Sequence, residues 1–250
     1  MCTVSFLPMR AGFMLAMNRD ERKSRPGGLA PRRHKAGPRN ALHPSEPGGG
    51  TWIGVNDAGL TLALINWYSK PQRDGSLCIS RGIVIPQLLA ADDLATVGNL
   101  LAEMPLARLN PFRLIAASLK DRAVREWRWD GAALQSRRHG WMRRHWFSSG
   151  YDEAAVNRKR AGLVRTAAGT ASAMTPAWLR KLHRSHLPER DAFSVCMHRE
   201  DAETVSYTEI LATSRSAEMR YSATSPCANK TGAPRLLSFA AKAAVQSQPR

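Results

Sequence analysis

Three pairs of short apolar segments, each joined by a tight turn, constrain the fold of this chain more than any other feature. The pairs are residues 2–7 with 12–18, 51–55 with 60–66, and 112–119 with 123–131. Pro and Gly separate the first pair, and Asn56, Asp57 and Gly59 lie between the second. Two strand-like runs joined by such residues predict a β-hairpin, and hairpins build antiparallel sheets.

The rest of the chain alternates between predicted helices and further strands. Apolar residues recur at helical spacing over 81–91 and 93–103, and Asp92 or Asp93 is a candidate cap of the second segment. The remaining patterns predict helices over 152–165 and 176–186, and strands over 192–199, 203–213 and 217–223. Strand pairs, then helices, then more strand pairs predict an α+β fold in which helices cover antiparallel sheets.

Two segments lack a sustained apolar period. Residues 19–50 are charged and rich in Pro and Gly, which predicts a long surface loop of the kind that often frames a site. Residues 228–250 contain no acidic residue and are rich in Ala, Ser and Lys, which predicts a disordered basic tail. We therefore expect one domain over residues 1–227, followed by that tail.

The charge of the chain points to anionic partners. Lys and Arg number 37 against 20 acidic residues, which gives a formal charge of +17. The basic residues are scattered, and no nucleic-acid-binding motif accompanies them, so we expect a small-molecule substrate or ligand, for which the charge favours an anion, and no specific nucleic acid. Trp127, Trp129, Trp141 and Trp146 lie among arginines and could stack on bases, but covering a core is the simpler interpretation.

The sequence lacks the signals of several other classes of protein. No apolar run is long enough to span a membrane, and the first residues do not resemble a signal peptide, so we expect a cytoplasmic protein. The glycine-rich phosphate-binding loops of nucleotide-dependent proteins are absent, and no cofactor is expected. Four cysteines without a C-x-x-C pair are typical of free thiols. The oligomeric state is open.

Cys2 is the most informative candidate for catalysis. Removal of Met1, which a small second residue permits, would leave Cys2 with both a thiol and a free α-amine. The amine titrates near neutral pH and can take the thiol proton, so that base and nucleophile belong to one residue. The alternative is a small residue buried in the first strand, which is the more common role of a cysteine.

Two further residues could complete such a site. The second strand returns to the start of the first, so Asp20, or Glu21 beside it, could hold the amine. Asn66 ends a strand and could donate a hydrogen bond to a substrate carbonyl. Each also has an ordinary interpretation, as a charged or amide side chain in a turn. On a strand, Asn18 and Asp20 project to one face and Arg19 to the other.

A metal site is the weaker alternative. His183 and His186 are spaced for one helix face, and Cys196 and His198 share one strand face, and these residue types suit zinc. The spacing matches no common zinc pattern, and Arg184 and Arg199 adjoin these residues. We therefore expect no metal, with the cysteine buried in a strand and the histidines at a basic helix end.

Five ordered motifs in the first third of the chain carry a resemblance. They are MCTVSF at the start, NRDE at 18–21, GGTWIGVNDAGL at 49–60, LIN at 64–66 and SRG at 80–82. In this order they closely resemble the NRDE-motif family, also called the Transport and Golgi Organisation protein 2 family. Similarity to bacterial members continues at SSG, residues 148–150, and at 183–186 and 193–210, and reaches about Cys227.

The resemblance implies a fold and a set of roles. The family is similar to the N-terminal-nucleophile hydrolases of the penicillin V acylase and bile salt hydrolase group, which implies a four-layer αββα sandwich. By that similarity Cys2 is the nucleophile, Asp20 holds its amine and Asn66 polarises the carbonyl. Asn18, Arg19, Ser148 and Ser149 are then candidate substrate-binding residues.

Two functions follow as hypotheses. In the first, the chain hydrolyses a non-peptide carbon–nitrogen amide bond through a thioester acyl-enzyme on Cys2, and Arg19 favours anionic substrates. In the second, the same scaffold binds or carries an anionic hydrophobic ligand, such as haem or a lipid, without turnover. Turnover that is lost in Cys2→Ala would support the first function, whereas ligand binding that survives this substitution would support the second.

Overall fold

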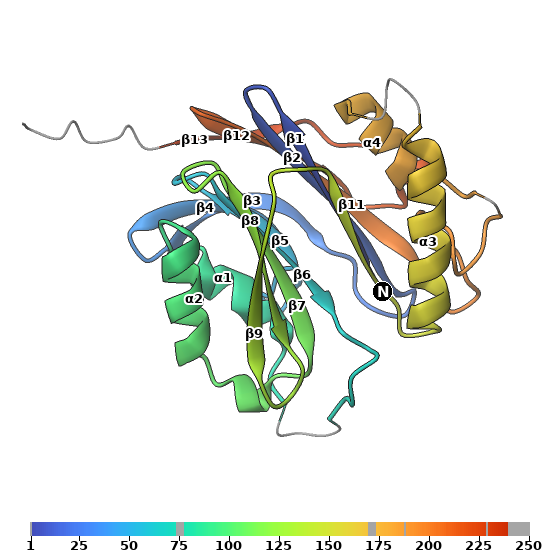
Figure 1. Cartoon of the computed structure of the whole chain (residues 1–250), viewed down its shortest axis with the longest axis horizontal. Coiled ribbons are helices and arrows are strands. Elements are labelled where there is room, and N and C mark those ends of the chain that lie inside the picture. The colour runs from blue at the N-terminus through green and yellow to red at the C-terminus, as the bar shows by residue number, and fades with distance from the viewer. Residues whose placement is uncertain (1, 74–77, 170–173, 188, 229, 240–250) are drawn as a thin grey trace, which may run out of the picture.

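The computed structural model describes residues 2–73, 78–169, 174–187, 189–228 and 230–239 of the chain. Two antiparallel sheets face each other, and helices cover the outer face of each (Figure 1). The order of layers is helix, sheet, sheet, helix. The α+β class and the four-layer αββα sandwich expected from the sequence are thereby confirmed.

The first sheet contains both ends of the described chain. Its six strands run in the order β10-β1-β2-β11-β12-β13, and every neighbouring pair is antiparallel. The bounds are Cys2–Met9 for β1, Gly12–Arg22 for β2, Arg144–Ser148 for β10, Ala202–Thr213 for β11, Ser216–Ser222 for β12 and Arg235–Ser238 for β13. The predicted first hairpin is therefore β1 and β2, near the centre of this sheet.

The second sheet is a continuous meander. Its seven strands follow sequence order from β3 to β9. The bounds are Leu29–Ala36, Arg39–Ser45, Ile53–Asn56, Leu60–Asn66, Phe112–Ser118, Ala123–Trp129 and Leu134–His139. The second predicted hairpin is β5 and β6, and the third is β7 and β8. Gly59 in the β5–β6 turn has φ +78, a conformation that favours glycine.

The helices lie where the apolar spacing predicted them. The second sheet is covered by the short η1 (Arg81–Ile83), α1 (Val84–Leu88), α2 (Leu94–Glu103) and η2 (Leu106–Arg108). The first sheet is covered by α3 (Glu153–Ala167) and α4 (Pro176–His183). The 3-10 turn η3 (Pro226–Ala228) follows β12. Asp93 caps α2, because its carboxylate accepts a hydrogen bond from the Thr96 amide, which has no partner within the helix.

Three apolar clusters hold the four layers together. One lies between the two sheets and includes Phe6, Phe13 and Trp146; the other two lie between each sheet and its helices. Trp127, Trp129 and Trp146 are buried in these clusters, which agrees with the core interpretation. None of the described helices is both long enough and apolar enough to cross a membrane.

The expectation of a long loop over residues 19–50 is wrong. β2 continues to Arg22, and two further strands, β3 and β4, follow. β3 is an edge strand whose residues are mostly exposed and include Arg32, Arg33 and Lys35, as is common at sheet edges, where charge prevents pairing with other chains. Without an apolar face this strand has no periodicity for sequence reasoning to detect.

Other boundaries also differ from the expectation. β9 and β10 arise from the basic, aromatic stretch that carried no assignment, and α4 ends at His183 instead of residue 186. Residues 192–199 form bends instead of a strand, apart from an isolated bridge between His198 and Glu203. The Asp191 carboxylate accepts hydrogen bonds from two following amides and turns the backbone there.

The predicted tail contributes to the first sheet. β13 pairs with β12, and Leu237 packs into the cluster between the sheets. The part of the tail beyond residue 239 lies outside the described residues.

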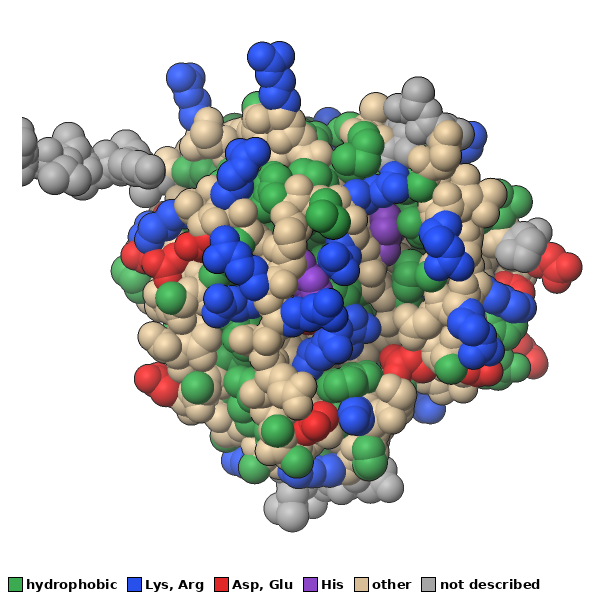
Figure 2. All heavy atoms as spheres, viewed as in Figure 1, with side chains coloured by type: hydrophobic (Ala, Val, Ile, Leu, Met, Phe, Trp, Pro, Cys, Tyr) green, Lys and Arg blue, Asp and Glu red, His purple; other side chains and the backbone are tan. Residues whose placement is uncertain are grey.

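Basic side chains are spread over the molecular surface. Figure 2 shows them across one face and gathered in its middle, in front of strands β7 to β9. Figure 2 thus agrees with a basic surface without a single continuous stripe.

Candidate functional site

A cavity of about 370 Å³ opens between the two sheets at the start of β1. Its walls come from β1, β2, the segment before β5, the end of β6 and η1. The lining residues central to its chemistry are Cys2, Arg19, Asp20, Glu46, Asn66 and Arg81. The three residues to which we assigned catalytic roles, Cys2, Asp20 and Asn66, therefore line one cavity.

Cys2 is half-buried at the first position of β1. It pairs in register with Arg19 on one side and with Ser148 on the other, so these three side chains share the face that looks toward the second sheet. Burial is the largest influence on the Cys2 thiol and raises its pKa. The Asp20 carboxylate also raises this pKa, whereas the N-terminal ammonium, the Asp20 backbone amide and Arg19 lower it. The thiol therefore needs a base to become a nucleophile at neutral pH.

Asp20 is held rigidly although it carries a charge. Thr204 donates a hydrogen bond of 2.6 Å to Oδ1, and Arg160 Nη2 lies 3.2 Å from Oδ2. β11 is bulged between Thr204 and Ser206, opposite Asp20 and Arg19. A bulge reorients the side chains beside it, and here it accompanies the contact between Thr204 and the carboxylate.

Arg160 reaches Asp20 from α3. Its side chain is fully buried, and it also donates to Thr3 Oγ1 at 2.7 Å and to the Phe193 carbonyl at 3.3 Å. A buried ion pair needs such additional hydrogen bonds to offset the loss of hydration. Arg160 thus fixes the carboxylate from the side opposite the cavity.

Arg19 projects to the other face of β2, as expected. Its Nη2 lies 2.5 Å from Glu46, and the guanidinium stacks over Trp52, with its carbon 4.5 Å from the ring centroid. Oε2 of Glu21 lies 3.6 Å from the same Arg19 nitrogen. The charge of Arg19 is therefore largely compensated within the cavity wall.

Asn66 ends β6 at the far wall of the cavity. Its Nδ2 donates to the Tyr68 hydroxyl at 2.7 Å. The Tyr68 ring packs against Gly150, where an added Cβ would lie 3.3 Å from the ring. Tyr68 therefore connects β6 with the segment that follows β10.

Arg81 is the cation of the cavity without a carboxylate partner among the described residues. It donates to the Pro111 carbonyl at 2.9 Å, and burial lowers the pKa of its guanidinium. The backbone of Gly82 lies against Gly50: a Cβ on Gly82 would lie 3.0 Å from the Gly50 Cα, and Thr51 donates to the Gly82 carbonyl. This close approach brings Arg81 to the cavity.

Three of the predicted substrate-binding residues lie outside the cavity lining. Asn18 is buried beneath α4, where its amide donates to the His183 and Val195 carbonyls. Ser149 accepts a hydrogen bond from the Tyr151 amide. Ser148 shares the face of Cys2, and its Oγ is buried without a hydrogen-bond partner within the described residues.

The structure adds residues that sequence reasoning missed. Arg81 stood within the quoted SRG motif but received no role, and Glu46 lay in the segment expected to frame a site. Thr204 and Arg160 had no local signal. Arg160 is one of several basic residues in α3, and the sequence does not show that it is the buried one. Its role becomes visible only once β2, which carries Asp20, is placed beside the helix.

These observations agree with a comparison of the sequence with known families. The model of Transport and Golgi organisation 2 matches residues 1–162, which is well over half of the chain. The chain belongs to the Transport and Golgi organisation 2 family. A search of curated proteins finds no significant match to the sequence.

Solved structures similar to this family member include two kinds of enzyme. A mutant of conjugated bile acid hydrolase from Clostridium perfringens has a TM-score of 0.54 at 10% identity, covering 94% of this chain and 92% of that chain. Another variant of that enzyme has a TM-score of 0.55 at 11% identity, with 95% and 92% covered. Penicillin V acylase from Agrobacterium tumefaciens has a TM-score of 0.52 at 13% identity, with 88% and 82% covered. At these identities the likeness shows a shared fold, that of the N-terminal-nucleophile hydrolases.

Proposed function

We propose that this protein is an N-terminal-cysteine hydrolase that cleaves a non-peptide carbon–nitrogen amide bond. The observation that carries the proposal is that Cys2, Asp20 and Asn66 line one cavity, with Cys2 at the first position of β1. Both kinds of enzyme among the similar structures are named for hydrolysis or acyl transfer, which supports the reaction class.

The first half of the reaction forms a thioester. After removal of Met1, the α-amine of Cys2 takes the thiol proton, and the sulfur attacks the substrate carbonyl. The C–N bond then breaks, and the leaving amine receives that proton from the ammonium group. The raised pKa of the thiol makes this base necessary, because little thiolate exists at neutral pH without it.

The second half regenerates the enzyme. Water attacks the thioester, its proton passes to the α-amine, and the carboxylic acid leaves as the Cys2 thiol is restored. Asp20 orients the amine in both halves, since a carboxylate can accept more hydrogen bonds than those from Thr204 and Arg160.

The developing oxyanion needs hydrogen-bond donors. Asn66 Nδ2 is one, because its partner Tyr68 can be replaced. Ser148 Oγ is the candidate for a second, because it is adjacent to Cys2 across the sheet and has no partner among the described residues. It is buried outside the cavity lining, so substrate binding would have to bring it into contact with the oxyanion. Loss of one such donor typically costs about 3 kcal/mol of barrier.

The charges of the cavity suggest an anionic group on the substrate. Arg19 and Arg25 are both compensated by Glu46 and Glu21, so Arg81 is the remaining cation among the described residues of the lining. An arginine that lacks a carboxylate partner can bind a carboxylate or phosphate with charge-assisted hydrogen bonds. We expect Arg81→Gln to raise KM about tenfold or more for amides that carry such a group, and far less for neutral amides.

The decisive experiment compares a masked and a free Cys2 amine. The chain is produced with a cleavable N-terminal extension that leaves Cys2 first after cleavage, and both forms are tested on a panel of acyl amides. We expect turnover only after cleavage, and a loss of at least about 100-fold in Cys2→Ala. Intact mass of the untagged protein shows whether Met1 is removed in the cell.

Two results would contradict the proposal. One is retention of Met1 in all of the untagged protein. The other is equal turnover by the masked and unmasked forms. Ligand binding without turnover, unchanged in Cys2→Ala, would instead identify a non-catalytic binder.

A further inference from the structure

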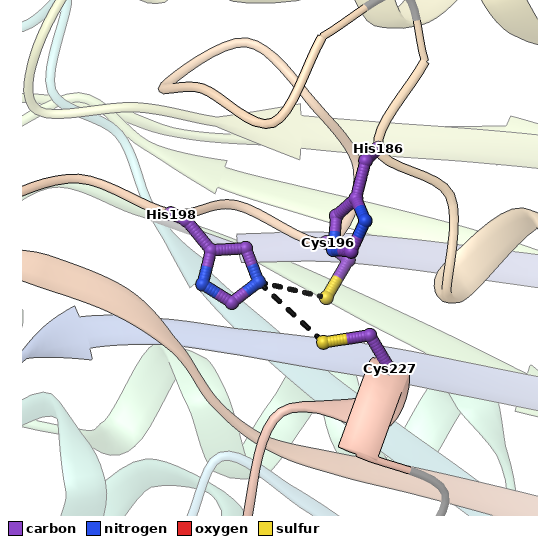
Figure 3. Close-up of side chains that lie close together, drawn as sticks. All are labelled: His186, Cys196, His198 and Cys227. Atoms are coloured by element: carbon purple, nitrogen blue, oxygen red, sulfur yellow. Dashed lines mark hydrogen bonds between the residues drawn. The ribbon is translucent and has the colours of Figure 1, made fainter.

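We propose that His186, Cys196, His198 and Cys227 bind a zinc ion. One ligand atom from each of these four residues lies within 4.8 Å of every other. Figure 3 shows the His198 ring directed at both sulfurs. All four residues lie beyond residue 162, outside the part of the chain that matches the family model.

Two of the six distances between ligand atoms match those of a tetrahedral zinc site, and the other four are at most 4.8 Å. Nε2 of His198 lies 3.6 Å from Cys196 Sγ and 3.5 Å from Cys227 Sγ (Figure 3). Zinc bonds of about 2.3 Å to sulfur and about 2.0 Å to nitrogen place neighbouring ligand atoms of a tetrahedron about 3.5 Å apart. A metal ion would therefore leave His198 and the two sulfurs close to their present spacing and draw the remaining ligand atoms together by about 1 Å.

The ligand chemistry favours zinc. Two thiolates and two neutral imidazoles are a set found in structural zinc sites, and four protein ligands leave no open position for water. Binding converts both thiols to thiolates and releases two protons, so the zinc and its ligands are neutral together. The neighbouring arginines therefore do not oppose binding, and Arg199 is already paired with Asp201 at 2.7 Å.

Two observations outside the four ligand atoms support the site. Nε2 of His186 is buried and has no hydrogen-bond partner within the described residues, so this nitrogen has no other polar contact in that part of the chain. The other nitrogen of His198, Nδ1, lies 3.6 Å from a Glu203 carboxylate oxygen and 3.4 Å from Arg190 Nη2. A carboxylate behind a histidine commonly orients it toward zinc.

The site would join three segments that lack regular structure. His186 follows α4, Cys196 and His198 precede β11, and Cys227 lies in η3. Between two of the ligands, the Met197 amide donates to Thr204 Oγ1 at 2.9 Å, and Thr204 contacts Asp20. Zinc would thus stabilise the backbone that supports Asp20. The inference itself does not depend on the proposed hydrolase activity.

The sequence analysis expected no metal, and of the four residues it weighed, His186, Cys196 and His198 lie in this cluster. His183 is buried at the end of α4, where Nδ1 contacts Asn18 and Nε2 contacts Ser5, so it is no ligand. The fourth ligand, Cys227, lies far along the chain from the other three. Only the pairing of β11 with β12 brings it to them.

The test measures zinc in the full-length, tag-free chain. After expression with added zinc we expect about one zinc per chain by mass spectrometry of metals. The zinc content per chain should fall at least about tenfold in Cys196→Ser and in Cys227→Ser. Cys78→Ser, a cysteine outside the cluster, is the matched control and should keep its zinc. Reconstitution of the stripped chain with cobalt should give the visible absorption of a tetrahedral site with thiolate ligands.

A second pair of variants keeps the test valid if a cysteine variant does not fold. Glu203→Gln should weaken zinc affinity about tenfold through His198, whereas the exposed Glu200→Gln should not change it. A chain without bound zinc after reconstitution under reducing conditions would overturn the proposal. So would a Cys196–Cys227 disulfide in protein alkylated at lysis, or unchanged zinc in both folded cysteine variants.

Discussion

At the scale of single residues, the properties of Cys2 are set by its surroundings more than by its own chemistry. A cysteine is an ordinary small residue in most strands, but here its thiol has a raised pKa and faces a cavity with charged walls. The neighbouring Asp20 both raises that pKa and is itself buried. The two residues therefore have to be tested together.

The first prediction concerns the reactivity of Cys2. In a Cys78→Ser background, the alkylation rate of Cys2 should rise with pH, with a midpoint above that of an unfolded reference peptide, because burial disfavours the thiolate and raises its pKa. Asp20→Asn should lower the midpoint, because it removes a negative charge. Peptide mass spectrometry follows the reaction. A midpoint at or below that of the peptide would contradict this account.

The second prediction concerns the buried ion pair. Arg160→Met leaves the Asp20 carboxylate buried without its cation, so the free energy of unfolding should fall by about 3–5 kcal/mol in urea denaturation. The double variant with Asp20→Asn should recover part of this loss. Arg158→Met, at an exposed position of the same helix, is the control and should change little. An Arg160→Met protein as stable as the control would show that the pair contributes nothing.

At the scale of elements, the site is assembled by contacts between segments that are distant in sequence. The approach of Gly50 to Gly82 brings η1 against the segment before β5, and the bulge in β11 accompanies the contact of Thr204 with Asp20. Two of the family's motifs, GGTWIG and SRG, therefore meet in space. Their glycines allow the backbones to approach, and the position of Arg81 follows from that approach.

The third prediction tests this contact. Gly82→Ala adds a Cβ that would lie 3.0 Å from Gly50 Cα and 3.2 Å from Ser80 Oγ. One segment has to move, so we expect a loss of about 1–3 kcal/mol in stability and a raised KM through displacement of Arg81. Gly48→Ala is the control, since a Cβ there would have no neighbour within 4 Å. Equal stability of the two variants would argue against a tight contact.

At the scale of the whole molecule, stability comes from three apolar clusters that span four layers. The cluster between the sheets receives residues from both ends of the described chain, from Val4 to Leu237. The last strand thus belongs to the same cooperative unit as the first. This arrangement bears on where the domain ends.

The fourth prediction concerns that end. A chain that stops before β13 loses the buried Leu237 and exposes the edge of β12, so its free energy of unfolding should fall by about 2–3 kcal/mol. A chain that stops after residue 239 keeps both features and is the control. If both truncations are equally stable, the folded domain ends near residue 227, as the sequence suggested.

The fifth prediction concerns acid. Burial lowers the pKa of His145 and of His183 to about 3, whereas an unfolded histidine titrates near 6.5. Below about pH 6.5 the unfolded state binds protons that the folded state does not, so the free energy of unfolding should fall as pH decreases toward 3. Each residue contributes about 1.4 kcal/mol per pH unit over that window. In His145→Gln, the free energy of unfolding measured in urea should depend less steeply on pH. An unchanged slope would contradict the lowered pKa of His145.

Elements with strong local patterns could be predicted from the sequence. Alternating apolar residues and turn residues specified the β1–β2, β5–β6 and β7–β8 hairpins. The pair Asp92 and Asp93 indicated the start of α2, and the structure shows that Asp93 is the cap. The ordered motifs indicated the family and its sandwich fold. The candidates Cys2, Asp20 and Asn66 followed from residue types that suit acyl transfer, and their roles stay predictions.

Features that depend on contacts between distant segments became visible only in the folded chain. β3 carries charge because it is an edge strand, Arg160 is buried because Asp20 lies opposite, and Cys227 joins Cys196 and His198 through the pairing of β11 with β12. None of these has a local period or spacing that a reader of the sequence could detect. The physical reason is that burial, charge pairing and metal ligation act between atoms close in space, whatever their separation along the chain.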